Sequence, residues 1–275
     1  MKQYIVDAFT AEPFAGNPAA VCVMETWPTE AAMMQLAREN NLSETAFLVR
    51  EEPAAGDDAG RFRLRWFTPG CEVELCGHAT LASAFTVLEL LVPGAQVVRF
   101  STMSGLLTVR REQNRFVMDF PTYPLEEIPV TDAMAAAFGA RPSRAVLGLD
   151  LICVFDDEAT VRGMAPNQTL LTRLPGRIQN ATAPAAPDSA TRPGTHCVSR
   201  SFCPKLAIAE DPVCGSAHVQ IADFWCRELG VSAVDCYQGS ARGGYLHGEP
   251  HGADRMFISG EAVLMAVSEI VAELS

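Results

Sequence analysis

The chain has 275 residues, of which 48% are hydrophobic and 20% are charged. A chain of this length and composition is expected to fold compactly and to bury about 75% of its unfolded surface, which excludes the disordered and fibrous classes. Its formal net charge of -12, from 21 Lys and Arg against 33 Asp and Glu, repels a phosphate backbone. We therefore expect neither nucleic acid nor an anionic membrane as a partner.

Two further features of the sequence bear on its location. The N-terminal stretch reaches Asp7 too early to hold the apolar core of a secretory signal, and no stretch approaches the ~20 apolar residues of a transmembrane helix. We therefore expect a cytoplasmic protein. The nine cysteines are an odd number, and several lie in apolar runs, as Cys22 and Cys153 do. We expect most of them to be free, buried thiols rather than parts of a disulfide framework.

The alternation of apolar and polar residues predicts many strands and a few helices. In chain order we predict a helix over 29–40, a strand over 61–66, a helix over 78–91, strands over 96–100, 105–110 and 115–120, a short helix over 131–138, a strand over 147–155, a helix over 216–229, and strands over 234–238 and 254–259. An Ala- and Pro-rich stretch over 181–194 is predicted to be a surface loop. Most of the sheet is expected to be antiparallel.

Two of the predicted helices begin alike. Cys76-Gly77-His78-Ala79 introduces the first and Cys214-Gly215-Ser216-Ala217 the second, and the two cysteines lie 138 residues apart (214 minus 76), half the length of the 275-residue chain. This spacing suggests an internal duplication in which each half supplies one Cys-Gly turn that opens a helix. A coincidence of two short motifs is the alternative.

A Cys-Gly turn at the start of a helix has a clear chemical use. The helix N-terminus presents unpaired amide hydrogens and a positive dipole end, glycine lets a ligand approach the backbone, and the thiol becomes easier to ionise. A carboxylate-bearing substrate suits such a site. If the turns of Cys76 and Cys214 face each other, one thiol can remove a proton while the other donates one. Alternatively, both cysteines are small buried residues at tight turns.

Glu44 is a candidate general base. It lies immediately before an apolar strand over 45–49, where its carboxylate could be pushed toward the interior. The alternative is a solvent-exposed glutamate in a turn. His78 could orient or protonate a substrate carboxylate, and Asp211, before Pro212, could hold such a group in place, although each is also an ordinary structural residue at its position.

The sequence predicts neither a metal nor a nucleotide cofactor. Cys71, Cys76 and His78 are clustered, but Cys-x4-Cys-x-His lacks a second pair of ligands at zinc-finger spacing. Phosphate-binding loops of the GxGxxG or GxxxxGK type are absent from the sequence.

Taken in order, several motifs resemble those of the PhzF-like phenazine-biosynthesis isomerase family, from residue 4 to about residue 265. The motifs are Asp7–Thr10, Phe14–Val21, Ser43–Phe47, Trp66–Pro69, Cys76–Thr80, Ser199–Phe202, Glu210–His218 and Gln238–Gly243. The resemblance implies an α+β fold like that of diaminopimelate epimerase, with two topologically similar lobes that each wrap an antiparallel sheet around a central helix and share an active site in the cleft between them.

The same resemblance implies the lobe boundaries. The N-terminal lobe would comprise residues 1–120, onto which a C-terminal segment of about 260–275 can pack back, and the C-terminal lobe residues 121–275. The two Cys-Gly helices would be the central helices. Many members of the family resemble homodimers, so a homodimer is expected.

The activity implied by the resemblance is a cofactor-independent isomerisation in which a proton moves within a small carboxylate-bearing metabolite. Glu44 matches the position of the family's general base. His78, Asp211 and Ser216 match residues that bind and polarise the substrate. Further substrate-binding candidates within the motifs are Asn17, Gly77, Gly215 and Gly243.

The chain also departs from the family pattern. Many members have threonine at the position of Cys214, so that Cys76 and Cys214 here form a pair similar to that of the two-cysteine racemases and epimerases of the same fold. The activity is therefore either isomerisation by Glu44 or racemisation by the two thiols. A non-catalytic binding or scaffold protein is a further alternative, because some members resemble binding partners more than enzymes. Before Val198 the usual Asp-Phe is replaced by His196-Cys197, and the preceding strand is expected to be replaced by the Ala- and Pro-rich loop.

Overall fold

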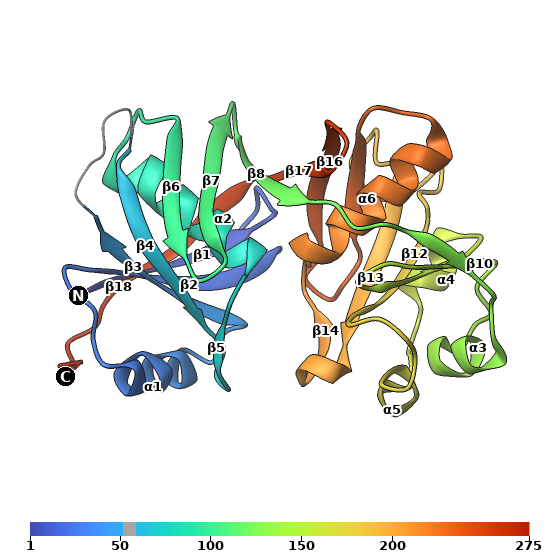
Figure 1. The fold of residues 1–275 in the computed structure, drawn as a ribbon, viewed down its shortest axis with the longest axis horizontal. Helices are drawn as coiled ribbons and strands as arrows, with labels where there is room; N and C mark the ends of the chain where they lie inside the picture. Colours follow the sequence, from blue (N-terminus) through green and yellow to red (C-terminus); the bar gives the residue numbers. More distant parts are fainter. Residues whose placement is uncertain (52–58, 275) are drawn as a thin grey trace. The chain divides into compact units, whose positions relative to one another are not determined.

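The structure of this protein is a computed structural model that describes residues 1–51 and 59–274. The chain forms two compact units, the first made of residues 1–119 and 259–275 and the second of residues 120–258. It leaves the first unit within β8 (Arg115–Pro121) and returns within β17 (Arg255–Gly260) (Figure 1). The described part of 259–275 contains β18 (Ala262–Glu269), which pairs with β1 (Lys2–Ala8) along the whole length of β1.

The first unit is a mixed sheet in the order β18-β1-β2-β3-β4-β6-β7-β8. Its remaining strands are β2 (Asn17–Met24), β3 (Glu44–Arg50), β4 (Arg61–Phe67), the short β5 (Glu72–Val73) beside β4, β6 (Val97–Thr102) and β7 (Gly105–Glu112). The pairs β2–β3 and β4–β6 are parallel and the others antiparallel. In β4, Phe62 and Leu64 are buried whereas the arginine between them, Arg63, is exposed, as strict alternation requires.

Helix α2 (Gly77–Phe85) is the buried helix of the first unit, and it contacts β1, β2, β3 and β18 (Figure 1). Every residue from His78 to Ala84 is buried. The hydroxyls of Thr80 and Ser83 donate to the carbonyls four residues earlier, so these polar side chains are buried without losing a partner. The helix continues as a π-helical turn, η1 (Thr86–Leu91), which together with α2 accounts for the predicted helix over 78–91.

Helix α1 (Glu30–Asn40) covers part of β3 and β4. It begins after Thr29, whose side chain accepts from the backbone N–H of Ala32, and it ends at Asn41 in the left-handed conformation. Met33 and Leu36 of α1 pack against Phe47 and Phe67 in a core cluster.

The second unit is also a mixed sheet, in the order β9-β10-β11-β12-β13-β15-β16, with β14 beside the other end of β13. The strands are β9 (Glu126–Ile128), β10 (Arg144–Leu147), β11 (Leu151–Val154), β12 (Gln179–Pro184), β13 (Cys197–Cys203), β14 (Ile208–Asp211), β15 (Val234–Gln238) and β16 (Gly244–His251). The pairs β11–β12 and β13–β15 are parallel.

Helices cover both faces of this second sheet. Helix α6 (Gly215–Leu229) packs on one face, where Nε1 of Trp225 donates to Oγ1 of Thr182 at 2.9 Å. Ala181 and Ala183 point to the other face and join the core formed with α3 (Asp132–Phe138), α4 (Glu158–Arg162) and α5 (Gln168–Leu171). Helix α3 confirms the short helix predicted over 131–138, and it ends at Gly139 in the left-handed conformation.

Three expectations need correction. The predicted strand over 147–155 is two antiparallel strands, β10 and β11, joined by a turn at Gly148 to Asp150. The predicted loop over 181–194 begins inside a strand, because β12 extends to Pro184 and pairs with both β11 and β13. The strand before His196 is therefore present, not replaced. As expected, most of the pairings between the described strands are antiparallel, although each sheet also contains parallel pairs.

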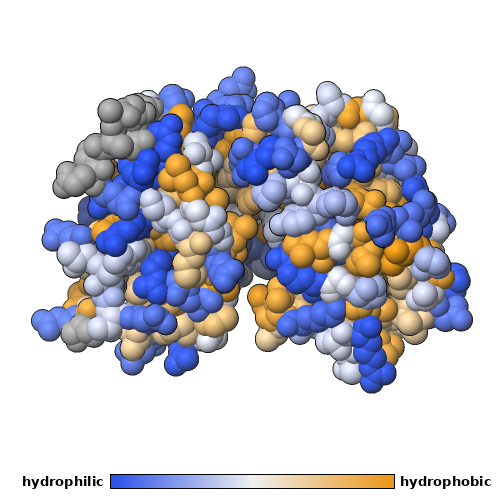
Figure 2. Space-filling model, viewed as in Figure 1, coloured by the Kyte–Doolittle hydropathy of each residue, from blue (hydrophilic) through white to orange (hydrophobic). Residues whose placement is uncertain are grey.

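The surface is mainly hydrophilic on the face shown in Figure 2, in keeping with the net charge of -12. All nine cysteines are free, and eight are buried as expected, whereas Cys71 is exposed. Among the helices of residues 1–51 and 59–274, none has the length and apolar character needed to cross a membrane.

Candidate active site

Four predicted site residues meet at one place in the first unit: Asn17, Glu44, Cys76 and His78, which we call the Glu44 cluster. Asn17 is the first residue of β2 and Glu44 the first residue of β3, and the two strands run parallel. Helix α2 begins directly after Cys76 and packs against both strands. The starts of two strands and of a helix therefore converge.

The imidazole of His78 lies at the centre of the Glu44 cluster. Its Nε2 is 3.0 Å from Oε2 of Glu44, and the two side chains are 5% and 12% exposed. Its Nδ1 is 3.2 Å from Nδ2 of Asn17 and 3.5 Å from Sγ of Cys76. His78 thus turns one nitrogen toward the Glu44 carboxylate and the other toward Asn17 and Cys76.

The charges in the Glu44 cluster set the protonation of its imidazole and its thiol. Burial lowers the pKa of His78, but Cys76 and Glu44 together outweigh burial and leave that pKa well above its ordinary value. Burial, reinforced by the Glu44 carboxylate, raises the pKa of Cys76 against the opposing effect of His78. Cys76 is therefore a thiol near neutral pH, which corrects the expectation that the helix start favours its ionisation. The group available to accept a proton is the carboxylate.

Three residues of the Glu44 cluster could also act as metal ligands, because donor atoms of Glu44, Cys76 and His78 all lie within 4.8 Å of one another. His78 turns Nε2 toward Glu44 and Nδ1 toward Cys76. Cys71 does not join them: it is exposed, and its Sγ lies 3.7 Å from Oγ1 of Thr68. Direct contacts therefore link the side chains of Glu44, Cys76 and His78.

Other predicted residues gather in the second unit, in the turn over residues 211–216, which we call the Cys214 turn. It joins the end of β14 at Asp211 to the start of α6 at Gly215. Oδ1 of Asp211 accepts from the N–H of Val213 at 3.0 Å. Gln238 of β15 braces the turn, because its Oε1 accepts from the N–H of Cys214 at 2.8 Å and its Nε2 donates to the carbonyl of Asp211 at 2.6 Å.

A buried histidine fixes the carbonyl of Cys214. Nδ1 of His218 lies 2.8 Å from this oxygen, and Nε2 lies 2.9 Å from Oγ of Ser199. Burial lowers the pKa of His218 to about 4, so the ring is neutral near pH 7. A carbonyl only accepts, which places the ring proton on Nδ1 and makes Nε2 the acceptor from Ser199. Burial, followed by Asp211 and Cys203, raises the pKa of Cys214 well above its ordinary value, so Cys214 is also a thiol.

Gly243 shapes a loop that supports the Cys214 turn. Its φ is +68°, and a Cβ there would lie 2.2 Å from the phenolic oxygen of Tyr237, so only glycine fits. Its N–H donates to Oγ of Ser240 at 3.1 Å, and that hydroxyl donates to the carbonyl of Pro212 at 2.6 Å. These contacts account for a glycine at position 243. That Gly243 also contacts a substrate remains a prediction.

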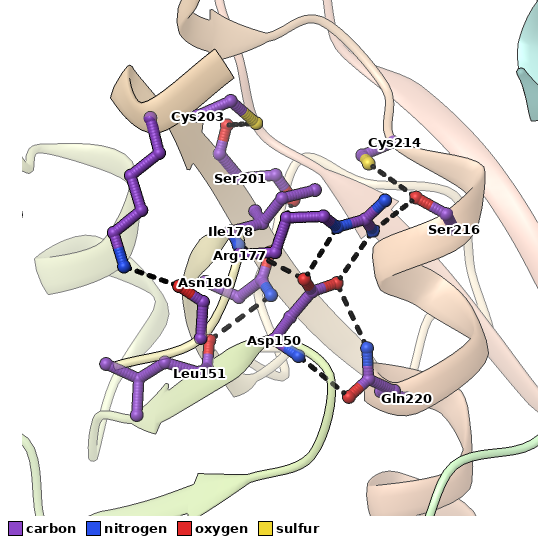
Figure 3. A network of polar contacts seen from close by, with 12 residues as sticks. Asp150, Leu151, Arg177, Ile178, Asn180, Ser201, Cys203, Cys214, Ser216 and Gln220 are labelled. Carbon is purple, nitrogen blue, oxygen red and sulfur yellow. Dashed lines mark hydrogen bonds and ion pairs between the residues drawn. The ribbon is translucent and has the colours of Figure 1, made fainter. Parts of the chain in front are cut away.

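The predicted residues thus form two groups, one in each unit. Asp150, Arg177 and Gln220 are not among the predicted site residues, yet they form a polar network around Ser216 of the Cys214 turn (Figure 3). Ser199 and His218 lie inside motifs that the sequence analysis singled out, but their contact with the Cys214 turn depends on the pairing of β13 with β15 and was not predicted.

The sequence is similar to those of known proteins over almost its whole length. Residues 6–268 match a family model described as phenazine biosynthesis-like protein. A Pseudomonas aeruginosa protein named as an uncharacterized isomerase is 42% identical over 259 residues, covering 94% of each chain. The Mus musculus protein called phenazine biosynthesis-like domain-containing protein 1 is 38% identical over 285 residues, covering 98% of each chain.

The fold is shared with solved structures. A phenazine biosynthesis protein of the PhzF family from Enterococcus faecalis has a TM-score of 0.90 at 42% identity, with 98% of this chain and 99% of that chain covered. A probable proline racemase from Agrobacterium radiobacter has a TM-score of 0.59 at 11% identity, with 99% of this chain and 93% of that chain covered, which shows the fold alone. The predicted α+β fold class, common to PhzF proteins and to the racemases and epimerases, is confirmed.

Proposed function

Because the chain belongs to the phenazine biosynthesis-like (PhzF) family of isomerases, we propose that it moves a proton within a small carboxylate-bearing metabolite, without a cofactor, and that Glu44 is the general acid and base. The observation that carries this proposal is the position of the Glu44 carboxylate, 3.0 Å from Nε2 of His78 and close to the Cys76 thiol, which burial keeps protonated.

The proposed reaction has two proton transfers on one carboxylate. Glu44 removes a proton from a carbon of the substrate, the C–H electron pair moves into the adjacent unsaturated or carboxylate-bearing system, and the protonated Glu44 returns the proton to a neighbouring carbon. His78 orients the carboxylate through its Nε2 contact, and Asn17 holds the ring through Nδ1. No redox equivalent is consumed, because the substrate and the product are isomers.

Binding of the substrate is assigned by family resemblance to the residues around the two helix starts. The backbone N–H groups at Gly77 and Gly215 belong to the first turns of α2 and α6, where helix amides lack partners within the helix and favour an anion. Asp211 and Ser216 complete the proposed binding residues. A homodimer and a cytoplasmic location are further parts of the proposal, which sedimentation equilibrium and cell fractionation test.

Proton exchange in deuterium oxide tests the assignment of Glu44. A panel of small cyclic and acyclic α-hydroxy, α-amino and unsaturated acids is incubated with the wild-type protein, and deuterium incorporation is followed by proton NMR. Glu44→Gln should lower the exchange rate by about 10²- to 10⁴-fold, the usual contribution of a general base. Cys76→Ser and Cys214→Ser should keep most of the exchange. Glu39→Gln, an exposed glutamate of α1, is the matched control.

The alternative with a specific observation behind it is a two-cysteine racemase or epimerase. Cys76 and Cys214 occupy the same position, the N-cap of a buried helix, in each unit. Exchange lost in the two cysteine variants but kept in Glu44→Gln, with inversion at one carbon of the product, would establish it and reject Glu44. A binding or scaffold protein would instead show no exchange on any acid, with wild type and variants alike.

A further inference from the structure

The guanidinium of Arg177 is held in a fixed orientation beside the Cys214 turn (Figure 3). Its Nε lies 3.1 Å from Oδ1 of Asp150 and its Nη2 lies 3.2 Å from Oδ2. The same Nη2 lies 3.1 Å from Oγ of Ser216. Two of the three guanidinium nitrogens are thus fixed by a fork that matches the carboxylate, which is how arginine is preorganised for recognition.

Asp150 holds this arginine in place from a buried position. It is fully buried, and its remaining acceptor positions are taken by Nε2 of Gln220 at 3.0 Å and by the N–H of Ile178 at 3.1 Å. Oε1 of Gln220 in turn accepts from the N–H of Asp150 at 3.1 Å. A buried carboxylate with all of these bonds made does not compete for a ligand, and it leaves the orientation of Arg177 fixed.

The third nitrogen of Arg177 distinguishes it from a purely structural arginine. Within the part of the chain that the structure describes, Nη1 has no hydrogen-bond partner in the protein, and Figure 3 shows it turned away from Asp150. The side chain is 37% exposed. By contrast, Arg200 forms a similar fork with Glu210, but its Nη1 donates to three backbone carbonyls and its side chain is only 13% exposed.

Ser216 adds a hydroxyl group to this network. Its oxygen accepts from Arg177, which leaves the hydroxyl proton to be donated either to Sγ of Cys214 or to a ligand. Its oxygen also lies 3.5 Å from Sγ of Cys214, at the start of α6. A hydroxyl donor, a guanidinium edge and the first-turn amides of α6 are therefore grouped at one place, and all of them donate. A carboxylate is the acceptor group that matches such a set.

We propose that Arg177 binds the substrate carboxylate at the Cys214 turn and determines the preference of the protein for acids over uncharged analogues. The carboxylate accepts from Nη1 of Arg177 and from the hydroxyl of Ser216. This inference rests on the proposed function and names a residue that lies outside the family motifs quoted above. Because Asp150 balances the charge of Arg177, recognition depends on directional hydrogen bonds more than on net charge, and lysine at this position is not equivalent.

Binding of benzoate tests the proposal without requiring turnover, since benzoate has no exchangeable proton beside its carboxylate. Affinity for benzoate and for its uncharged isostere benzamide is measured by calorimetry on the full chain. Arg177→Gln should weaken benzoate binding by about tenfold to a hundredfold, the effect of one hydrogen bond to a charged group, and leave benzamide binding unchanged. Arg177→Lys should recover less than half of the lost binding energy. Arg141→Gln, an exposed arginine paired with Asp132, is the matched control.

Two further measurements keep the test decisive. On the wild-type protein, the ¹⁵N resonance of Arg177 Nε, assigned by its loss in Arg177→Lys, should shift with benzoate and stay unchanged with benzamide, so the outcome does not depend on whether Arg177→Gln folds. Glu44→Gln should bind benzoate like the wild type, which separates failure of the proposed proton transfer from failure of this inference. Equal benzoate affinity in the wild type and Arg177→Gln, or a wild type that binds benzoate no tighter than benzamide, would overturn the proposal.

Discussion

The neutral state of His218 makes the Cys214 turn sensitive to pH. His218 has a folded-state pKa of about 4, lowered from 6.5 by burial, and it connects Ser199 to the carbonyl of Cys214. Between these two values the unfolded chain binds the proton more readily than the folded chain, so stability is fully present above pH 6.5 and is lost as the pH falls toward 4. Protonation of His218 also puts a proton on Nε2. This nitrogen can then no longer accept the hydrogen bond that the Ser199 hydroxyl donates to it.

We therefore expect the free energy of unfolding of the wild type to fall by up to about 3 kcal/mol between pH 6.5 and pH 4 through His218 alone. Urea unfolding curves at a series of pH values measure this decrease. His218→Gln should have a lower free energy of unfolding than the wild type at pH 7. Because it lacks the histidine, it should not lose stability through this protonation, so the difference in free energy of unfolding between the two proteins should narrow as the pH falls. A difference that is constant with pH would contradict the low pKa of His218.

At the residue scale, the Glu44 cluster could be anticipated and the Arg177 network could not. Glu44 and His78 stand in motifs with a family resemblance, and their neighbours in sequence mark the starts of a strand and a helix. Arg177 follows a Pro-Gly turn at the start of a strand, where an arginine is ordinary, and its partners Asp150 and Ser216 lie 27 and 39 residues away. Only the folded arrangement brings these side chains together.

At the element scale, the turn between β10 and β11 connects packing to the Arg177 network. A Cβ on Gly148 would lie 2.4 Å from Oε1 of Gln220 and 2.9 Å from Cδ2 of Leu125. Gln220 holds both the carboxylate and the N–H of Asp150, so displacing it loosens the support of Arg177. The glycine is therefore required by a close approach to helix α6.

Gly148→Ala should destabilise the protein by about 1–3 kcal/mol, the cost of overpacking a filled site, and should also weaken benzoate binding. Gly70→Ala is the control, because a Cβ there meets only Oγ1 of Thr68 at an ordinary 3.7 Å. Thermal unfolding and calorimetry on both variants give the two quantities. Loss of stability with unchanged benzoate affinity would show that Gln220 does not contribute to holding Arg177.

The elements that sequence reasoning placed correctly carry local signals. Helix α1 has a threonine N-cap, α3 has a threonine N-cap and a C-terminal glycine, and β4 alternates strictly. The two errors lack such signals. Residues 147–155 are almost continuously apolar, and the turn within them is selected by contact with Gln220. In 181–184, alanine is a weak strand former in isolation, but here it fits a sheet that helices cover closely on both faces.

At the scale of the whole molecule, the two units repeat one topology. From β1 to β7 the successive pairings are antiparallel, parallel, antiparallel, parallel and antiparallel, and the pairings from β10 to β16 follow the same sequence. In both units a short strand, β5 or β14, follows the fourth strand of this series and leads into the buried helix. The 138-residue spacing of the Cys-Gly turns reflects this structural repeat.

The repeat also predicts how the chain behaves when it is divided. Residues 120–258 form a continuous unit with their own sheet, buried helix and core, whereas the first unit depends on β18, which is supplied from the far end of the chain and pairs with β1 from Lys2 to Ala8. Without β18, the fragment 1–119 would expose the edge of β1. We expect residues 120–258 to fold alone and residues 1–119 to require the segment 259–275.

Hydrogen exchange followed by mass spectrometry measures both outcomes. The isolated fragment 120–258 should keep slow exchange in α6 and β12, and the fragment 1–119 should exchange quickly in β1 and β2 until a peptide of residues 259–275 is added. A rearranged fragment in which 259–275 is joined by a Gly- and Ser-rich linker ahead of Met1 should recover slow exchange in β1, because β18 then pairs within one chain. Slow exchange in fragment 1–119 alone would show that its sheet is complete without β18, and that the far end of the chain adds little to the first unit.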